Sequence, residues 1–110
     1  MKVNKELMKG STVTLILSLL SRKEMYGYEM VKGIETSSGG VFSFKEGTLY
    51  PILHTLEAEG YVEAYWMDEG ARKRKYYRLT DEGRMHLEQK QKEWKLFRTT
   101  VDRVIGEGGA

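Results

Sequence analysis

Apolar side chains recur at helical spacing in four segments of the chain and at alternate positions in two shorter ones. Residues 46–62 carry the most regular helical stripe, and Gly60 supplies a helix stop near its end. Pro51 lacks an N–H and suits the first turn of a helix, so we expect this helix to begin close to Gly47 or Thr48. The stripe, which predicts one buried face, consists of Leu49, Ile52, Leu53 and Leu56.

The opposite face of this predicted helix is almost free of charge, yet it can form hydrogen bonds. Its residues are Gly47, Pro51, His54, Thr55 and Ala58, with Tyr50 at the flank. Such a face is either simply solvated or suited to contact with a partner, and the helical pattern alone leaves both interpretations open.

Two further helices are predicted before this one. The first runs without a break from Val3 or Asn4 to Ser21, and the second from about Gly27 to Thr36. The first helix has two apolar stripes, so its own domain should cover one side and a second element, which can belong to another chain, the other. The stripes are Val13, Ile16, Leu17 and Leu20 on one face and Met8, Thr12, Leu15 and Leu19 on the adjoining face.

After Gly60 the period of the pattern changes from helical to two, which is typical of strands. Residues 61–66 predict a half-buried strand in which Val62, Ala64 and Trp66 share one face, and residues 75–80 predict a second strand. Because a short turn segment joins them, the two strands should form a β-hairpin. Three helices followed by a hairpin are the element order of a winged helix, in which the third helix can enter a DNA major groove.

The C-terminal segment is predicted to be one long helix from a cap at Thr80 to about Ile105. Its apolar residues form a heptad seam, which Lys90 weakens at one position. Because so long a helix would overhang a small core, we expect the seam to pair with a second subunit, with packing on its own domain as the alternative. The expected dimer interface consists of Leu19, Leu87, Trp94, Phe97, Val101 and Val104.

Composition indicates one folded domain with no special chemistry. The chain has 110 residues, of which 40% are hydrophobic and 31% charged. The absence of cysteine excludes disulfides and thiolate sites and agrees with a reducing compartment, so we expect a cytoplasmic protein. The longest apolar run, residues 13–20, is far shorter than the ~20 residues of a membrane span.

Catalytic motifs are not recognisable in the sequence. The two histidines, His54 and His86, lie on different predicted helices without neighbouring ligands, which argues against a metal site. The glycines form no phosphate-binding loop between a strand and a helix. We therefore expect neither an enzyme nor a bound cofactor.

Positive charge is concentrated in the predicted hairpin. Residues 80–110 contain six acidic and six basic side chains, so the net charge of +2 lies wholly in residues 1–79. A run of basic residues can be a solvated loop or a nucleic-acid contact, and its place on a predicted wing favours the second interpretation. The run consists of Arg72, Lys73, Arg74, Lys75 and Arg78.

Three segments together resemble the PadR family of bacterial transcriptional regulators. They are YGYEMVKGI (residues 26–34), GTLYPILHTLEAEGYV (47–62) and RKYYRLTDEG (74–83), and the similarity covers roughly residues 7–105. The helix that carries Trp94 resembles that of the family's small subfamily. The resemblance implies a winged helix-turn-helix dimer that binds a palindromic operator, usually as a repressor, and releases it when a small molecule binds.

The same resemblance makes the third helix the recognition helix and the hairpin the wing. Tyr50 then either presents its hydroxyl to a phosphate or packs against the wing. The DNA contacts implied are Lys45, Thr48, Tyr50 and His54 on or beside the helix, and Arg72, Lys73, Arg74 and Lys75 on the wing.

Multidrug-sensing relatives hold flat aromatic compounds between two symmetry-related tryptophans at the place of Trp94. Arg98 lies one turn beyond Trp94, which fits a neutral or anionic ligand better than a cationic one. The alternative is that Trp94 fills the dimer core. The candidate ligand-binding residues are Met8, Leu15, Trp94, Phe97 and Arg98.

These observations predict a mainly α fold with a β-hairpin. Residues 1–79 form a winged helix-turn-helix DNA-binding domain, and residues 80–110 form a C-terminal dimerisation helix in one compact unit with it. The expected function is that of a ligand-responsive repressor that binds double-stranded operator DNA as a homodimer. The alternatives are a sensor of aromatic compounds or a protein-interaction scaffold without specific DNA binding, and a purely structural dimer.

Overall fold

The computed structural model describes residues 3–106, with the backbone alone for Lys5 and Glu6. Residues 1–2 of the predicted DNA-binding domain and residues 107–110 of the predicted C-terminal segment lie outside that range. Within it the chain forms α1 (Lys5–Lys9), α2 (Thr12–Arg22), β1 (Met25–Tyr26), α3 (Gly27–Ser37), α4 (Glu46–Ala58), β2 (Val62–Glu69), β3 (Arg72–Leu79) and α5 (Asp81–Ile105).

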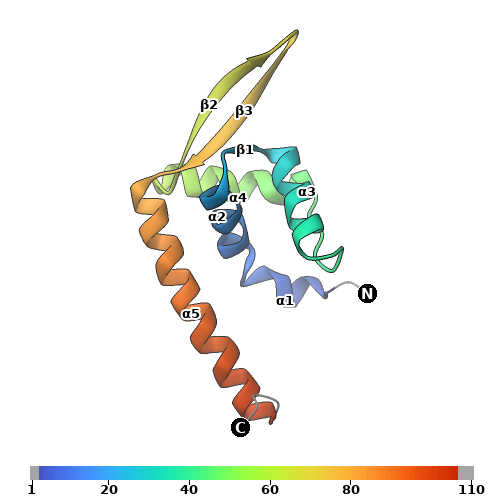
Figure 1. Cartoon of the computed structure of the whole chain (residues 1–110), viewed down its shortest axis with the longest axis vertical. Coiled ribbons are helices and arrows are strands. Elements are labelled where there is room, and N and C mark those ends of the chain that lie inside the picture. Colours follow the sequence, from blue (N-terminus) through green and yellow to red (C-terminus); the bar gives the residue numbers. More distant parts are fainter. Residues whose placement is uncertain (1–2, 107–110) are drawn as a thin grey trace.

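The fold is a winged helix with one long additional helix, as predicted. The strands lie in the order β1-β3-β2, and both neighbouring pairs are antiparallel. The β2–β3 hairpin and α5 project from the helical body in different directions (Figure 1). These two arms explain a radius of gyration of 15.5 Å, which exceeds the ~13 Å of a compact domain of this length.

The core lies between α2, α3, α4 and the base of the sheet. Ile16, Met30 and Tyr77 are fully buried members of it, contributed by α2, α3 and β3. The apolar stripe predicted for the third helix is confirmed, because its residues face this core. Leu49, Leu53 and Leu56 are buried and Ile52 is partly buried against them.

The first helix is not continuous, contrary to the prediction. It is divided into α1 and α2 at Gly10 and Ser11. The carbonyl of Met8 accepts hydrogen bonds from the Ser11 backbone N–H at 3.0 Å and from the Thr12 hydroxyl at 3.0 Å. Glycine has a low helix propensity, and serine and threonine hydroxyls compete for backbone acceptors, so the break arises locally.

The start of α4 also differs from the prediction. The helix begins at Glu46 after the N-cap residue Lys45, so Pro51 lies in the second turn and not in the first. Proline cannot donate to the carbonyl four residues earlier, that of Gly47. Both residues are exposed, so the break in the hydrogen-bond ladder faces solvent.

Two features of the sheet were not predicted. Met25 and Tyr26 form the short strand β1, which pairs with Tyr77 and Tyr76 of β3. Trp66, which was expected on a half-buried face, is exposed. The reason is that β2 extends beyond the helical body, so only its first residues have the core beneath them.

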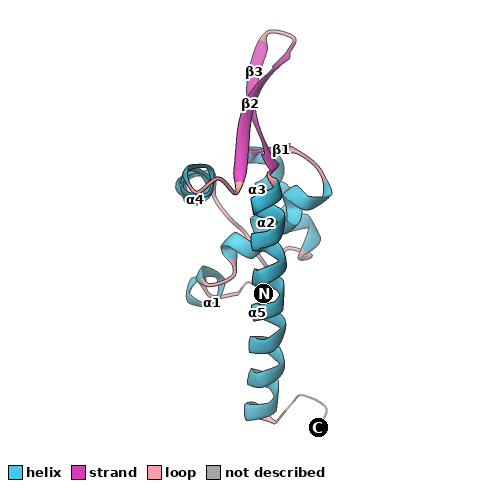
Figure 2. Ribbon diagram, turned by 90° about the vertical axis from the view of Figure 1, so that its left-hand side faces the viewer, coloured by secondary structure: helices cyan, strands magenta, loops and turns pink. Residues whose placement is uncertain are grey.

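The long helix α5 has the predicted limits and cap. The Thr80 hydroxyl accepts a hydrogen bond from the Gly83 N–H at 2.9 Å and donates one to the carbonyl of Gly60 at 2.6 Å. The side-on view shows α5 running down from the base of the wing, with α4 seen almost along its axis beside it (Figure 2). The start of α5 is therefore fixed to the turn between α4 and β2.

Candidate nucleic-acid interface

An open groove of about 900 Å³ lies between the wing and the helices α3 and α4. It brings together six of the eight residues predicted to contact DNA, and four aromatic residues that were not predicted line it as well. Four of the ten lining residues are Arg or Lys and none is Asp or Glu, so the groove is cationic. The lining consists of Tyr26, Tyr28, Tyr50, His54, Trp66, Arg72, Lys73, Arg74, Lys75 and Tyr77.

The four wing cations fall into two pairs with different surroundings. Arg74 forms an ion pair with Glu69 at 3.1 Å, and Lys75 forms one with Glu57 of α4 at 3.7 Å. Arg72 and Lys73 are exposed, and no ion pair or ring contact holds either of them within residues 3–106. Arg74 and Lys75 therefore help to position the wing, while Arg72 and Lys73 are the cations available to an anionic partner.

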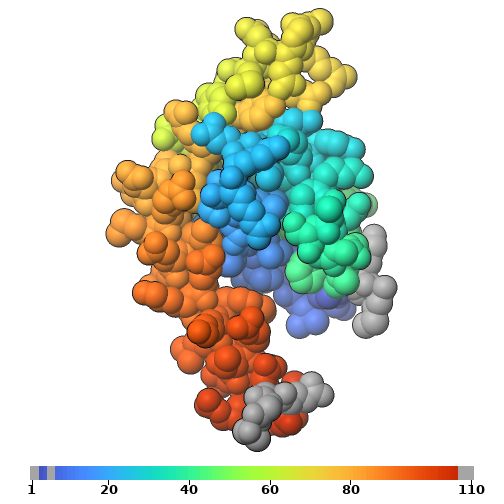
Figure 3. Space-filling view, viewed as in Figure 1, coloured from blue at the N-terminus to red at the C-terminus, as the bar shows by residue number. Residues whose placement is uncertain are grey.

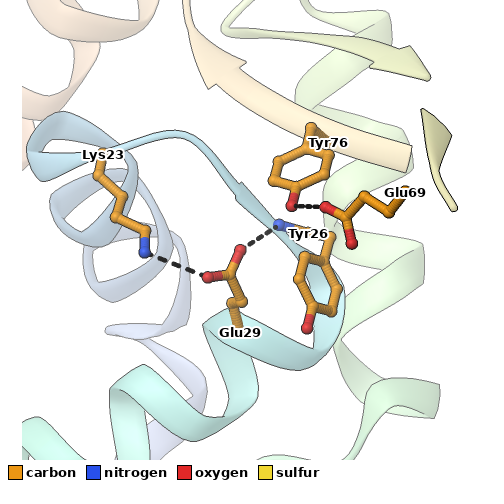
Figure 4. Close-up of polar contacts among 5 residues, drawn as sticks. All are labelled: Lys23, Tyr26, Glu29, Glu69 and Tyr76. Atoms are coloured by element: carbon orange, nitrogen blue, oxygen red, sulfur yellow. Dashed lines mark hydrogen bonds and ion pairs between the residues drawn. The ribbon is translucent and has the colours of Figure 1, made fainter. Parts of the chain in front are cut away.

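Aromatic side chains stiffen the base of the wing. The Arg74 guanidinium lies 4.3 Å from the centroid of the Tyr26 ring, and the Tyr26 and Tyr76 rings meet edge to face at 5.4 Å. The Tyr76 hydroxyl donates to Glu69 at 2.5 Å (Figure 4), and this bond raises the pKa of Tyr76 to about 12. β3 is thereby tied to the segment that leads into α3.

That segment is itself fixed by a carboxylate of α3. Glu29 accepts a hydrogen bond from the Tyr26 backbone N–H at 3.3 Å and pairs with Lys23 at 3.2 Å (Figure 4). A carboxylate in the first turn of a helix also interacts favourably with the helix dipole. The position of Tyr26 in the groove thus follows from the start of α3.

Tyr50 makes a contact with α3 that was not predicted from the sequence. Its ring lies against Gly27 of α3, where a Cβ atom would overlap the Tyr50 hydroxyl. Burial, and after it the charge of Glu46, raises the pKa of Tyr50. The residue lines the groove while its ring helps to hold α4 against α3.

Tyr77 contributes a buried hydroxyl beneath the groove. Its side chain is fully buried, and its hydroxyl has no hydrogen-bond partner among the residues that the structure describes. Burial is the largest cause that raises the pKa of this tyrosine, followed by the charge of Glu57. The floor of the groove therefore stays uncharged at neutral pH.

Lys45 and Thr48 do not line the groove and lie together at the N-terminal end of α4. Lys45 is the N-cap residue, whose carbonyl accepts from the Thr48 N–H at 3.0 Å. Both side chains are exposed. The structure thus leaves these two residues accessible beside the helix start and does not gather them with the other six.

The predicted dimer-interface residues divide into two groups. Leu19 and Leu87 are buried within their own chain, where they belong to the core. Trp94, Phe97, Val101 and Val104 are exposed on the distal half of α5, and the exposed fractions of Phe97 and Val104 are 60% and 80%. This half projects from the body as a free arm (Figure 3). The two leucines therefore have little surface left for a partner.

The predicted ligand-binding residues are not gathered around one cavity in the single chain. Met8 is buried and Leu15 is half-buried on the body, whereas Arg98 is exposed on α5. The Trp94 and Phe97 rings stack at a centroid distance of 5.9 Å. A second groove, of about 500 Å³, lies between α2, α4 and α5 and is lined by none of the five.

The aromatic lining of the first groove was the part that sequence reasoning missed. Tyr26 and Tyr28 flank the first residue of α3, and the sequence shows no sign that this helix start faces the wing. Trp66 was available as a signal, because it lies directly opposite Lys75 in the hairpin register. Nothing in residues 3–106 forms a cluster of three or more potential metal ligands. None of the helices found there is long and apolar enough to cross a membrane.

Comparison with known proteins is consistent with this geometry. The model of the transcriptional regulator PadR-like family matches residues 16–89. The structure of a transcriptional regulator from Clostridium thermocellum is 36% identical and covers 92% of this chain and 96% of its own, with a TM-score of 0.85. An uncharacterized protein of Lysinibacillus sphaericus is 36% identical over 91% of this chain and 93% of its own length.

A further solved structure contains DNA. It is Bacillus subtilis PadR in complex with operator DNA, which is 30% identical and has a TM-score of 0.65. The match covers 71% of this chain and 44% of that one, so this chain spans less than half of that relative.

Proposed function

Because this chain belongs to the PadR-like family of transcriptional regulators, we propose that it binds double-stranded operator DNA through α4 and the wing. It does so as a homodimer in the cytoplasm, and it acts as a repressor. The observation that carries the proposal is the cationic groove between the wing and the recognition helix, in which no carboxylate lines the wall. A duplex supplies the matching series of negative charges.

The elements are arranged as DNA recognition requires. α3 and α4 form the helix-turn-helix, and α4 presents the exposed side chain of His54 in the groove beside the wing. Polar side chains on such a helix can reach base edges in the major groove, while Arg72 and Lys73 reach phosphates. That B. subtilis PadR forms a complex with operator DNA supports operator DNA as the partner of this chain.

Dimerisation follows from the distal half of α5. Its seam of Trp94, Phe97, Val101 and Val104 is exposed, and burying apolar surface of this extent against an identical helix is favourable. A two-fold dimer presents two recognition helices, so the operator should be palindromic, with half-sites about one helical turn, ~10 bp, apart or a multiple of that spacing.

The test is a fluorescence-anisotropy titration against the chain's own promoter fragment at several salt concentrations. Each phosphate contact contributes about one unit to the slope of log K against log salt. Changing Arg72 and Lys73 together to Ala should lower that slope by about two units, because these are the unpaired cations. The matched control is the double change of Arg74 and Lys75, which are partly neutralised by Glu69 and Glu57 and should change the slope less.

Weak and equal binding of the wild type to all fragments would contradict a specific regulator. An unchanged salt slope in the Arg72 and Lys73 variant, with intact specific binding, would contradict only the wing assignment.

A second function, the sensing of a planar aromatic effector, is favoured by the Trp94–Phe97 stack on α5. In a dimer the two stacks face each other, and a flat ring can lie between the indoles, with Arg98 favouring a neutral or anionic compound. Met8 and Leu15 have less free surface and stand at the margin of such a site.

Trp94→Ala tests this function through fluorescence and DNA release. We expect the variant to bind the operator and to lose its response to aromatic compounds. A variant that becomes monomeric would show instead that Trp94 is a dimer-core residue, and an unchanged response would place the effector elsewhere.

A further inference from the structure

Trp66 is a large apolar side chain in an unusual position. Its exposed fraction is 65%, although it shares a strand face with Val62, which is buried in the core. Trp66 is the first residue on that face to lie beyond the helical body, and it lines the cationic groove. A single exposed apolar residue needs no explanation by itself. An indole that lines a cationic groove, however, adds an apolar surface to a place where an anionic partner can bind.

The surroundings of Trp66 restrict what this partner can be. Lys75 lies directly opposite it in the hairpin, and Lys73 follows on the same face of β3. His54 and Tyr50 of α4 stand across the groove. A partner that covers the indole must therefore be negatively charged and must also present an apolar surface between its charges.

A single strand of a DNA duplex has both properties. Its phosphates carry the charge, and the deoxyribose rings between them are apolar. When α4 lies in the major groove and the wing reaches the adjacent minor groove, the sugar–phosphate strand that separates the two grooves must pass between α4 and the wing. That space is the groove that Trp66 lines.

We propose that Trp66 is a DNA-contact residue, which packs its indole against the deoxyribose of the strand running between the recognition helix and the wing. The proposal rests on the proposed function and adds a specific, uncharged contact to it. Lys73 pairs with a phosphate beside this sugar, and the indole N–H is available as a donor to a phosphate oxygen.

An uncharged contact has a distinct signature in binding experiments. Lys73→Ala removes a phosphate contact, so the slope of log K against log salt should fall by about one unit. Trp66→Ala displaces no counterion, so it should lower the affinity about tenfold at every salt concentration and leave the slope unchanged. Trp66 and Lys73 lie on the same face of the hairpin, one on each strand, so the two variants are matched in position.

Trp66→Phe is the control for the loss of an aromatic ring. It should retain most of the affinity, because a phenyl ring can cover the same sugar. Thermal unfolding of each variant checks the fold, and we expect little change for Trp66→Ala because the side chain packs on nothing in the core. If Trp66→Ala does not fold, Trp66→Phe and the fluorescence experiment still test the proposal.

Fluorescence identifies the contact directly, because the chain has two tryptophans. Saturating operator DNA should change the emission of the wild type, and the change should be absent from Trp66→Phe. The same change in both proteins would assign it to Trp94 and overturn the proposal. An emission shift that follows protein concentration without DNA, and that is absent from Trp66→Phe, would overturn it in favour of a second copy in the groove.

Failure of this inference and failure of the proposed function give different results. If the wild type binds no operator specifically, the proposed function fails and this inference fails with it. If the wild type binds but Trp66→Ala binds equally well at all salt concentrations, only the contact of Trp66 is disproved.

Discussion

The wing and the distal half of α5 both project from the helical body, but only the wing is held in place by side-chain contacts with the rest of its own chain. On the wing, Arg74, Lys75 and Tyr76 are held by carboxylates and by other rings of the same chain. On α5 every residue from 91 to 101 is exposed, and the apolar seam has only the internal stack of Trp94 and Phe97.

This difference shows which arm is complete in a single chain. The wing owes its shape to contacts with its own strands, β1 and α4, so it is preorganised for a polar partner that needs no rearrangement of the protein. The distal half of α5 is a helix because of its backbone hydrogen bonds alone, and its seam gains stabilisation only when a partner covers it.

The largest effect should follow from breaking the junction of the two arms. A Cβ on Gly83 would overlap the carbonyl oxygen of Tyr61 and approach a methyl group of Leu79. Gly83→Ala should therefore lower the free energy of unfolding by about 3 kcal/mol, measured by urea denaturation.

The control is Gly47→Ala, another glycine within a helix, where nothing lies within 4 Å of an added Cβ. It should be neutral or slightly stabilising, by about 0.5 kcal/mol. Equal effects of the two changes would show that α5 is not fixed at its start.

A smaller effect on folding, but a clear one on assembly, is expected on the α5 seam. Phe97→Glu places a charge in the centre of the proposed dimer seam and should raise the dimer dissociation constant about a hundredfold, by ~2.7 kcal/mol. Sedimentation at several concentrations measures this change. The domain itself should stay folded, because Phe97 is exposed in the single chain.

Leu96→Glu is the matched control. Leu96 is as exposed and apolar as Phe97, but it lies off the heptad seam. A dimer that is weakened equally by both changes would mean that the interface is not the seam, and the contrast between the two arms would lose its basis.

The smallest effect concerns the wing at alkaline pH. Because the pKa of Tyr76 is raised to about 12, its protonated form is favoured by folding. The stabilisation is complete below the ordinary tyrosine pKa of ~10 and is lost as the pH rises from there through 12. Because burial also raises the pKa of Tyr50 and Tyr77, spectrophotometric titration should show several tyrosines that ionise late, and Tyr76→Phe should remove one of them.

Glu69→Gln sharpens this experiment. It removes the carboxylate to which Tyr76 donates, so the late ionisation should move toward the ordinary tyrosine range while the tyrosine is retained. If Glu69→Gln and the wild type show the same number of late-ionising tyrosines, the hydrogen bond to Glu69 is not the cause of the raised pKa of Tyr76.

Much of the fold could be predicted because its signals are local. The start of α3 at Gly27, the Thr80 cap and the hairpin all follow from spacing and turn residues within a few positions. The site residues Arg72, Lys73, Arg74 and Lys75 were visible as an uninterrupted basic run on the predicted wing. The prediction began the second strand at residue 75, whereas β3 already begins at Arg72.

The remaining features depend on contacts between distant segments. β1 has two residues and exists only because β3 pairs with it. Leu87 is covered because the start of α5 packs on the body. A heptad pattern cannot show this, because Leu87, Trp94 and Val101 occupy equivalent positions in it. Tyr26 and Tyr28 reach the groove only because β1 pairs with β3, so these two tyrosines had no local signal.

The connection between β3 and α5 gives the molecule a mechanical property. One residue, Thr80, separates the end of the strand at Leu79 from the start of the helix at Asp81, and it is pinned to the Gly60–Tyr61 turn. The directions of the wing and of α5 are therefore both set at this one turn. The 25-residue helix is about 37 Å long and the 8-residue strand about 26 Å. A change in the direction of α5 at its first turn would therefore be passed directly to the base of β3, with no flexible loop to absorb it.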